Sequence, residues 1–333
     1  MMVSASPRVR ATIKQVAAEA GVSIATVSLV MRELGNFPDK TRQHVKDTAE
    51  RLGYHANKRA ASLRSGNNRT IGYVLTAASN HEWTTQWSGM LAQVLFGLVV
   101  TASKRDYSIV IVPANSPEAM ASFGLDALIL NDSSDNDPDI ETAHRLGLII
   151  GTYDRPDDPR VSVHLDSGDA RMTIGALDYL SSRGSSRPGL LTEEENLVSN
   201  SRQVESYLNW CAQRGIPPVV VRGRHDRVNL NDRVDDLIDA GCDAIYSFYA
   251  EGPAILKRIQ ERGLSCPGDI QLIAASPYDD DENRALGISS TVYHPELMIE
   301  GPVNLLMDAI EGTISLPTTF SAPWELATHA TTR

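Results

Sequence analysis

The N-terminal part of the chain places apolar residues with the period of a helix. A stretch from Ile13 to Ala20 follows Thr12 and stops at Gly21, and Ser23 stands where a second helix can begin at once. Thr and Ser side chains accept hydrogen bonds from free N–H groups at a helix start, and glycine tolerates the left-handed backbone of a tight exit. The pattern therefore predicts two short helices joined by a tight turn, a helix-turn-helix.

One face of the second helix should pack on the first helix, at Val16 and Ala17, and on a third helix. Its members recur at i, i+4 and i+7 and are Val27, Met31 and Leu34. The other face is free to enter a groove and consists of Ala25, Ser28, Leu29 and Arg32. Two capped helices with an apolar stripe also occur in small bundles without a role in DNA binding, so periodicity alone leaves both interpretations open.

Charge separates these interpretations. Residues 1–69 contain 12 Lys and Arg against 5 Asp and Glu, a formal balance of +7, whereas the rest of the chain contains 19 against 37, or −18. The whole-chain charge of −11 hides this asymmetry. A basic head on an acidic body favours phosphate binding by the head alone, because each phosphate that a cation neutralises releases counterions.

Three blocks of sequence, in this order, carry a resemblance to a known family. They are TIKQVAAEAGVSIATVSLVMR (12–32), KTRQHVKDTAERLGY (40–54) and NKRAASLRSGNNRTIGYVL (57–75). Together they closely resemble the LacI-type (lactose-repressor/galactose-repressor) family of bacterial transcription regulators. The resemblance implies an α/β protein with an N-terminal all-α helix-turn-helix domain at 1–56 and a hinge helix with a linker at 57–69. A two-lobed, periplasmic-binding-protein-like domain for effector binding and dimerisation is implied at 70–333.

The DNA contacts implied by the resemblance divide into two kinds. Contacts to phosphates and backbone are implied for Thr12, Ser23 and Thr26. Contacts to base edges in the major groove are implied for Ile24, Ala25, Ser28 and Leu29. Many relatives have Arg or His where Leu29 stands and Asn where Arg32 stands. Because Leu29 cannot donate to guanine, we expect an operator half-site that differs from those of arginine-bearing relatives, with Arg32 supplying a charged contact.

The hinge segment is too short and too polar to hold together as an isolated helix. In the family it folds on operator binding, and paired leucines of two subunits enter the minor groove and bend the DNA. Leu63 matches that leucine. The positions around it suit the groove floor and the phosphates and are Asn57, Arg59, Ala60 and Arg64. A linker with an incidental leucine is the less favoured interpretation.

From Arg69 onward, apolar runs of strand length alternate with helical stretches. Ten such runs are 70–76, 107–113, 125–131, 146–153, 160–165, 187–192, 217–223, 243–248, 270–276 and 288–294. They predict parallel sheets covered on both faces, and a body of this length exceeds one comfortable core, so we expect two α/β lobes. The resemblance implies chain crossovers near 164–168 and 292–296 and a third before the C-terminus. Lobe one then comprises about 70–165 plus 295–318, and lobe two about 166–292 plus 319–333.

The resemblance also implies an effector between the lobes, at the C-terminal ends of the strands. Asp166 matches an interlobe aspartate, and Arg202 matches an arginine that grips hydroxyls or carboxylates. The usual Asn-Asp pair is replaced by Phe248 and Tyr249, and Ser276 stands at a usual aspartate. We expect a carbohydrate, a sugar or sugar derivative, or a base stacked on an aromatic face. A less polar effector and a loss of ligand control are the alternatives.

Other motifs add little chemistry. Trp83 and Trp87 follow the first strand and either stack on the ligand or pack between the lobes or in the core. His81-Glu82 lacks the spacing of zinc ligands, and YDDDEN (278–283) lacks the spacing and glycine of a calcium loop. We expect no metal and no cofactor.

The composition and the motifs of the chain argue against two other classes of protein, a secreted solute-binding protein and an enzyme. The three cysteines, Cys211, Cys242 and Cys266, are an odd number, which argues against a disulfide framework and fits a reducing cytoplasm. A secreted solute-binding protein would share the two lobes, but it would need an export signal and would lack the basic head. An enzyme would need a phosphate loop, a nucleophile elbow or clustered ligands, and none is apparent. We therefore expect a cytoplasmic, non-membrane homodimer, not an enzyme, that acts as a repressor on double-stranded operator DNA under effector control.

Overall fold

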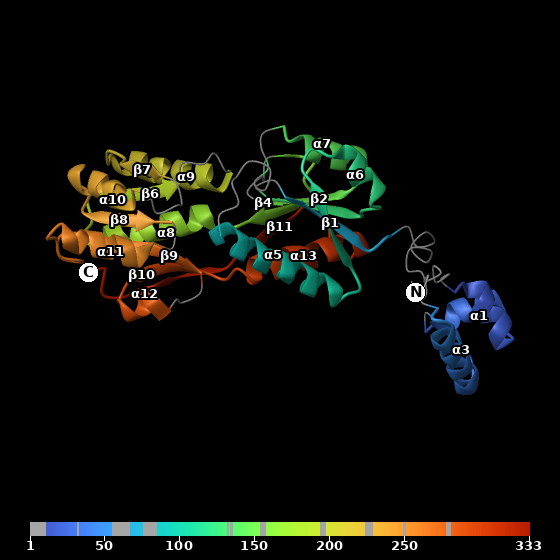
Figure 1. The fold of residues 1–333 in the computed structure, drawn as a ribbon. Coiled ribbons are helices and arrows are strands. Elements are labelled where there is room, and N and C mark those ends of the chain that lie inside the picture. The colour runs from blue at the N-terminus through green and yellow to red at the C-terminus, as the bar shows by residue number, and fades with distance from the viewer. Residues whose placement is uncertain are drawn as a thin grey trace, which may run out of the picture. The chain divides into compact units, whose positions relative to one another are not determined.

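The computed structural model describes residues 11–31, 33–54, 67–75, 85–131, 133, 136–153, 158–193, 198–223, 229–248, 251–277 and 281–333. The chain divides into two compact units, a helical unit up to Asn68 and an α/β unit from Arg69 to Arg333 (Figure 1).

The helical unit, called the head below, consists in its described residues of α1 (Ile13–Ala20), α2 (Ile24–Met31) and α3 (Asp39–Leu52). Its buried core is formed by Val16, Ala17, Ala20, Val27, Val30, Val45 and Ala49. The prediction that Val27 faces α1 and α3 is confirmed, but the prediction for Leu34 is wrong, since 46 % of its surface is exposed. The reason is that α2 ends at Met31 and Glu33 turns left-handed, with φ of 59°, so helical spacing no longer applies at Leu34. Val30 occupies the core instead.

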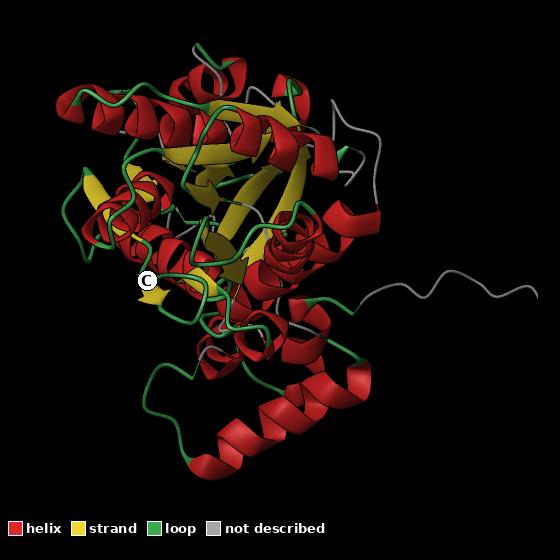
Figure 2. Ribbon diagram, turned by 90° about the vertical axis from the view of Figure 1, so that its left-hand side faces the viewer, coloured by secondary structure: helices red, strands yellow, loops and turns green. Residues whose placement is uncertain are grey.

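The α/β unit contains two six-stranded sheets covered by helices on both faces (Figure 2). The first sheet has the order β11-β5-β4-β3-β1-β2, and every neighbouring pair is parallel. Its strands are β1 (Thr70–Leu75), β2 (Ser108–Pro113), β3 (Ala127–Leu130), β4 (Ile149–Tyr153), β5 (Val163–Asp166) and β11 (Thr318–Ser321). Its helices are α5 (Thr85–Ser103), α6 (Pro117–Ser122), α7 (Pro138–Arg145) and α13 (Leu297–Glu311). We call this part lobe one.

The second sheet has the order β12-β10-β9-β8-β6-β7 and forms lobe two. Its strands are β6 (Pro188–Glu193), β7 (Val220–Gly223), β8 (Ala244–Ser247), β9 (Gln271–Pro277), β10 (Ser289–Tyr293) and β12 (Trp324–Ala327). The pairing of β12 with β10 is antiparallel and the other pairings are parallel. Its helices are α8 (Asp169–Ser182), α9 (Val198–Arg214), α10 (Leu230–Asp239), α11 (Gly252–Glu261) and α12 (Asp281–Ala285).

The chain passes between the two sheets three times: after β5, after β10 and between β11 and β12. All ten apolar runs form strands, as predicted. The sequence pattern did not predict β11 and β12, which are four residues long; β11 (TTFS) has three polar residues and β12 (WELA) has one. Because β11 pairs with β5, the last crossover lies between Ser321 and Trp324, slightly beyond the expected lobe boundary at 318.

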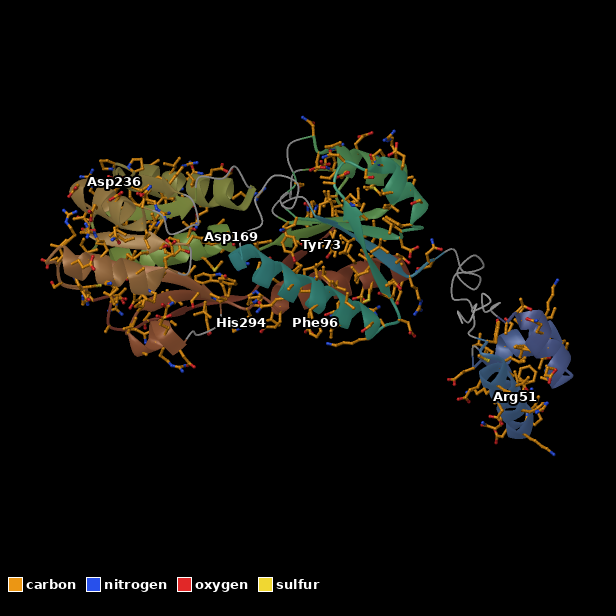
Figure 3. All side chains as sticks on the ribbon, viewed as in Figure 1. Arg51, Tyr73, Phe96, Asp169, Asp236 and His294 are labelled. Carbon is orange, nitrogen blue, oxygen red and sulfur yellow. The ribbon has the colours of Figure 1, made fainter. Side chains whose placement is uncertain are left out.

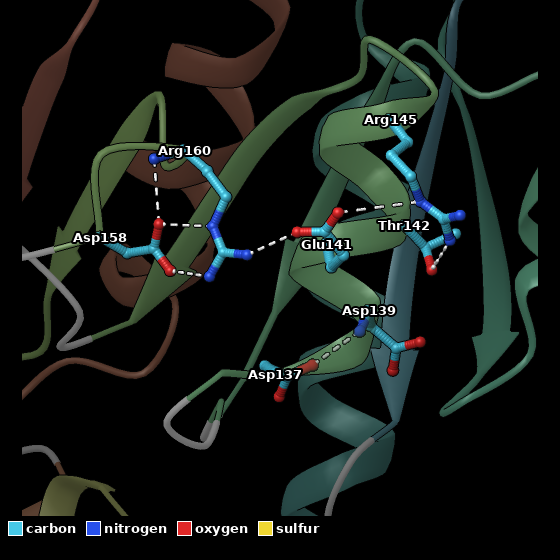
Figure 4. A network of polar contacts seen from close by, with 7 residues as sticks. All are labelled: Asp137, Asp139, Glu141, Thr142, Arg145, Asp158 and Arg160. Atoms are coloured by element: carbon cyan, nitrogen blue, oxygen red, sulfur yellow. Dashed lines mark hydrogen bonds and ion pairs between the residues drawn. The ribbon is translucent and has the colours of Figure 1, made fainter.

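A polar network braces α7 within lobe one (Figure 4). Arg160 donates from Nε and Nη2 to the two oxygens of Asp158, at 2.9 and 2.6 Å, and from Nη1 to Glu141 Oε2 on α7, at 2.9 Å. Both oxygens of Asp139 accept from the backbone N–H of Asn115, each at 3.0 Å. These contacts fix α7 against the segment that follows β2 and the segment that precedes β5.

Candidate nucleic-acid interface and ligand site

The turn between α1 and α2 sets the angle of the second helix. Thr12 and Gln15 form a reciprocal capping box at the start of α1, in which Thr12 N–H donates to Gln15 Oε1 at 2.7 Å. Gly21 ends α1 with φ of 63°, a left-handed conformation that favours glycine. Ser23 Oγ accepts from Thr26 N–H at 3.0 Å and so caps α2. The bend between the two helices is 105°, within the range of helix-turn-helix motifs.

The core anchors one side of α2 and leaves the other side to solvent. Val27 and Val30 are fully buried, whereas 46 % of Ile24 is exposed. Ala25 is also exposed, and Ser28 and Leu29 are half-buried. This small, largely uncharged face is the one that the sequence analysis assigned to base contacts.

Ion pairs within the head offset part of its acidic charge. Lys46 Nζ lies 3.0 Å from Glu33 Oε1, and Arg51 Nη1 lies 3.1 Å from Glu19 Oε1. The hydrogen bond and charge of Lys46 lower the pKa of Glu33, so this carboxylate stays ionised and paired at neutral pH. Exposed Lys14 and Lys40 add positive charge to the same small unit.

Several of the predicted site residues lie outside the described residues. They are Arg32, Asn57, Arg59, Ala60, Leu63, Arg64, Trp83 and Tyr249.

Asp166 ends β5 at the first crossover, and its carboxylate is already engaged. Its Oδ2 accepts from Arg171 Nε at 2.8 Å, and its Oδ1 accepts from Gly168 N–H at 2.9 Å. Arg171 Nη2 also donates to the carbonyl oxygen of Ala322 at 2.7 Å. We call Asp166, Arg171 and Ala322 the crossover clamp, because they connect the first crossover to the third. Sequence reasoning missed Arg171, since only the return of the chain at Ala322 reveals its role.

The other predicted effector residues belong to lobe two. Arg202 is half-buried on α9, next to Gln203, whose Oε1 accepts from Thr192 Oγ1 at 2.7 Å. Phe248 follows β8, is half-buried and packs against the cluster that includes Tyr207 and Tyr246. Ser276 lies near the end of β9 and is fully buried, and its hydroxyl has no hydrogen-bond partner. The carboxyl ends of parallel strands are where open α/β sheets bind ligands.

The surroundings of the three cysteines disfavour reactive thiolates. All three are free thiols. Burial raises the pKa of Cys242 to about 11 and that of Cys266 to about 12, and it also raises the pKa of Cys211. Nucleophilic thiolates are therefore disfavoured at neutral pH.

Neither a metal cluster nor a long apolar helix is found among the described residues. No group of three or more His, Cys, Asp and Glu residues is arranged to hold a metal ion there. No single described helix is long and apolar enough to cross a membrane. The bent pair α1 and α2 reaches the necessary length and apolar composition only when the two helices are taken together.

The comparisons with known proteins match this architecture. Residues 12–57 match the family model of bacterial regulatory proteins of the lacI family, and residues 177–332 match a periplasmic binding protein-like domain. The HTH-type transcriptional regulator PtxS of Pseudomonas plecoglossicida is 26 % identical over 326 residues, covering 92 % of this chain and 91 % of that protein. MalR of Staphylococcus xylosus is 24 % identical, covering 90 % and 92 %.

Solved structures show the same fold. The lac repressor dimer bound to operator and the anti-inducer ONPF superimposes with a TM-score of 0.75 at 18 % identity, covering 97 % of this chain and 99 % of that one. The complex of the transcriptional regulator CelR with cellobiose gives a TM-score of 0.63 at 22 % identity, covering 97 % and 100 %.

The head and the two-lobed body together define a class: a DNA-binding transcription regulator with a helix-turn-helix head and a periplasmic-binding-protein-like body. Within that class, residues 12–57 place the chain with the lacI family of bacterial regulatory proteins, as the resemblance predicted.

Proposed function

We propose that the protein is a cytoplasmic repressor that binds a pseudo-palindromic operator as a homodimer. A sugar or sugar derivative raises or lowers its affinity for the operator. The observation that carries the DNA-binding part is the outward face of α2, held at 105° to α1 by Gly21 and by the buried Val27 and Val30. A recognition helix presented in this way enters the major groove with its N-terminal residues on base edges.

The sequence of that face sets the expected chemistry of recognition. Ala25, Ser28 and Leu29 offer one hydroxyl and apolar surface, which suit thymine methyl groups better than guanine. Thr12, Ser23 and the backbone N–H groups at the helix starts then contact phosphates and fix the register. The positive charge of the head supplies the salt-dependent part of the affinity.

Dimerisation is supported by an apolar surface on lobe one. Phe96, Val99 and Val100 of α5 are 73 %, 52 % and 37 % exposed, and Leu297 of the adjacent α13 is 38 % exposed. Figure 3 shows the position of Phe96 on α5. We call these four residues the α5 surface. The occupant we propose is a second copy of this chain, because one small helix-turn-helix head makes too few contacts for a specific site. The related lac repressor was solved as a dimer on its operator.

Effector control then follows from linkage. An effector shifts DNA affinity only if its own affinity differs between two arrangements of the lobes. Residues proposed to line the effector site are Trp83, Asp166, Arg202, Phe248, Tyr249 and Ser276.

Leu63→Ala tests the operator-binding proposal. The wild-type protein first selects a site from random palindromic duplexes, and binding is then titrated by fluorescence anisotropy. Loss of the minor-groove wedge removes a few kcal/mol, so affinity for the selected site should fall roughly 10- to 100-fold. Affinity for unrelated DNA at low salt should change less than about threefold, because phosphate contacts dominate there.

Leu34→Ala is the matched control, since Leu34 is an exposed leucine of the head outside the predicted contacts. It should leave both affinities unchanged. If Leu63→Ala weakens specific and nonspecific binding equally, the hinge assignment is wrong. If no sequence is enriched in the selection, the operator-binding proposal itself fails.

A further inference from the structure

Lobe two buries an arginine that has no hydrogen bond to any described residue. Arg233 lies on α10, and only 8 % of its side chain is exposed. Its Nε and Nη2 atoms are buried without a hydrogen-bond partner. The nearest carboxylate oxygen is Oε1 of Glu251, 3.9 Å from Nη2, which is too far for a hydrogen bond. Burial of a guanidinium in this state costs several kcal/mol, so its presence calls for a partner.

The chain makes room for this side chain. Arg233 runs over Gly223, the last residue of β7, where a Cβ atom would lie 2.1 Å from Arg233 Cδ. Only glycine therefore allows the arginine to cross the carboxyl end of the sheet at this point. The unpartnered donors, Nε–H and Nη2–H, form one edge of the guanidinium. That edge is the one that binds the two oxygens of a carboxylate or a phosphate side by side.

Other buried polar groups lie around the same end of the sheet. Glu251 precedes the N-terminus of α11, whose free N–H groups favour negative charge. Asn283 Oδ1 is buried without a partner and lies 3.0 Å from where a Cβ of Gly252 would stand. Ala274 Cβ lies 3.1 Å from the same point, and Ser276 follows two residues later on the same face of β9, its hydroxyl also unpartnered.

The topology of the sheet points to this place as well. In the order β9-β8-β6-β7, the chain leaves β6 for β7 on one side and returns to β8 on the other. The strand order therefore reverses between β6 and β8, and ligands of open α/β sheets bind outside the carboxyl ends at such a point. Glu251 and Gly252 come a few residues after the end of β8 at Ser247 and begin α11.

We propose that Arg233, with Asn283, Ser276 and the N-terminus of α11, forms a subsite for an oxyanion of the effector. The effector is then a hydroxylated acid, a sugar that carries a carboxylate or a phosphate group. The Arg233 edge and the helix N–H groups supply donors for the oxyanion, and Asn283 Oδ1 with the Glu251 carboxylate supplies acceptors for hydroxyl groups. This inference rests on the proposed function and narrows its effector class.

The test is a thermal-shift titration of the full chain with glucose, gluconate, glucuronate, glucose 6-phosphate and inorganic phosphate. A ligand at a hundredfold excess over its Kd should raise Tm by roughly 5 °C or more. We expect a shift with an acidic sugar and none with glucose. Carboxylate and phosphate sources are distinguished by which acid acts, and inorganic phosphate shows whether the anion suffices alone.

Two variants test whether Arg233 is responsible for the thermal shift with the acidic sugar. Arg233→Lys keeps the charge but loses the two-donor edge, so it should fold and bind the acidic sugar about 10- to 100-fold more weakly. Arg222→Met is the matched control, because Arg222 is an exposed arginine one residue before Gly223. It should leave the shift unchanged.

Two results would overturn the inference: equal shifts with glucose and its acids, or a shift with an acid that Arg233→Lys leaves intact. If no compound acts, the inference also fails, and the DNA selection with Leu63→Ala then decides the proposed function separately. If Arg233→Lys does not fold, Arg233→Met combined with Glu251→Gln removes both buried charges, and loss of acid binding in that folded variant is required.

Discussion

At the scale of single residues, the Asp243 carboxylate of lobe two accepts several hydrogen bonds. It accepts hydrogen bonds from the hydroxyl of Ser185, from the N–H and hydroxyl of Ser186 at 2.7 and 2.8 Å, and from the N–H of Arg187 at 3.0 Å. Burial alone would raise the pKa of Asp243, but these donors together lower it. The carboxylate therefore fixes the segment between α8 and β6.

Asp243→Asn should lower the free energy of unfolding by about 1–3 kcal/mol at pH 7, because an amide replaces a charged acceptor of several donors. The folded pKa lies below the unfolded value of about 3.9, so the contribution of Asp243 is present above pH 4 and is lost as the pH falls through the folded pKa. Urea unfolding at pH 7 and near pH 3 should show a smaller difference between wild type and variant at the lower pH.

Asp281→Asn is a suitable control, since the side chain of Asp281 is 90 % exposed. Its replacement should change stability by no more than a few tenths of a kcal/mol at either pH. A cost for Asp243→Asn that is the same at both pH values would show that shape, and not charge, explains the effect.

At the scale of elements, each of the two last strands is fixed by an aromatic ring that packs on a glycine of a helix. A Cβ on Gly301 of α13 would lie 2.0 Å from Phe320 of β11. A Cβ on Gly175 of α8 would lie 2.3 Å from Trp324 of β12. The strands are short, so these ring contacts, more than strand propensity, hold them against their lobes.

Gly175→Ala should destabilise lobe two by about 1–3 kcal/mol, because the added methyl overlaps the Trp324 ring and forces it to move. The double variant Gly175→Ala with Trp324→Ala should lose this penalty, and relative to Trp324→Ala alone it should gain up to about 1 kcal/mol from the better helix former. Thermal unfolding of the four proteins in this cycle measures the coupling. Additive costs would show that the two residues do not press on each other.

The same elements show how much the sequence could predict. The first ten strands were predictable because each lies in a stretch rich in apolar residues between turn signals, and the capped helices of the head were predictable from Thr12, Gly21 and Ser23. The strands β11 and β12 were not, since their stability comes from contacts with helices that are distant in sequence. The outward face of α2 was predictable from helical spacing. The roles of Arg171 in the crossover clamp and of Arg233 in lobe two were not, because both depend on segments that are distant in sequence.

At the scale of the whole molecule, we expect the α5 surface to link dimerisation to operator binding. Phe96→Asp should place a charge in the proposed dimer contact and raise the dimer dissociation constant at least 100-fold, since an unpaired buried charge costs several kcal/mol. Sedimentation velocity across a dilution series measures this. Specific operator affinity should fall with it, while Tm at low concentration should stay close to that of wild type.

Glu118→Asp is a mild control, because Glu118 is exposed on α6, and it should leave the dimer intact. If Phe96→Asp sediments like wild type at every concentration, the α5 surface is not the dimer contact, and a dimer would have to form through another face of the chain.

The third crossover leaves little backbone freedom between the lobes. Only Ala322 and Pro323 separate β11 of lobe one from β12 of lobe two. The proline ring fixes its own φ near −65° and restricts the residue before it, and Ala322 is also held at both its N–H and its carbonyl oxygen by the crossover clamp. Because this connection has so few free torsions, we expect a change in the angle between the lobes to be a rotation about an axis close to it, with larger displacements at the other two connections.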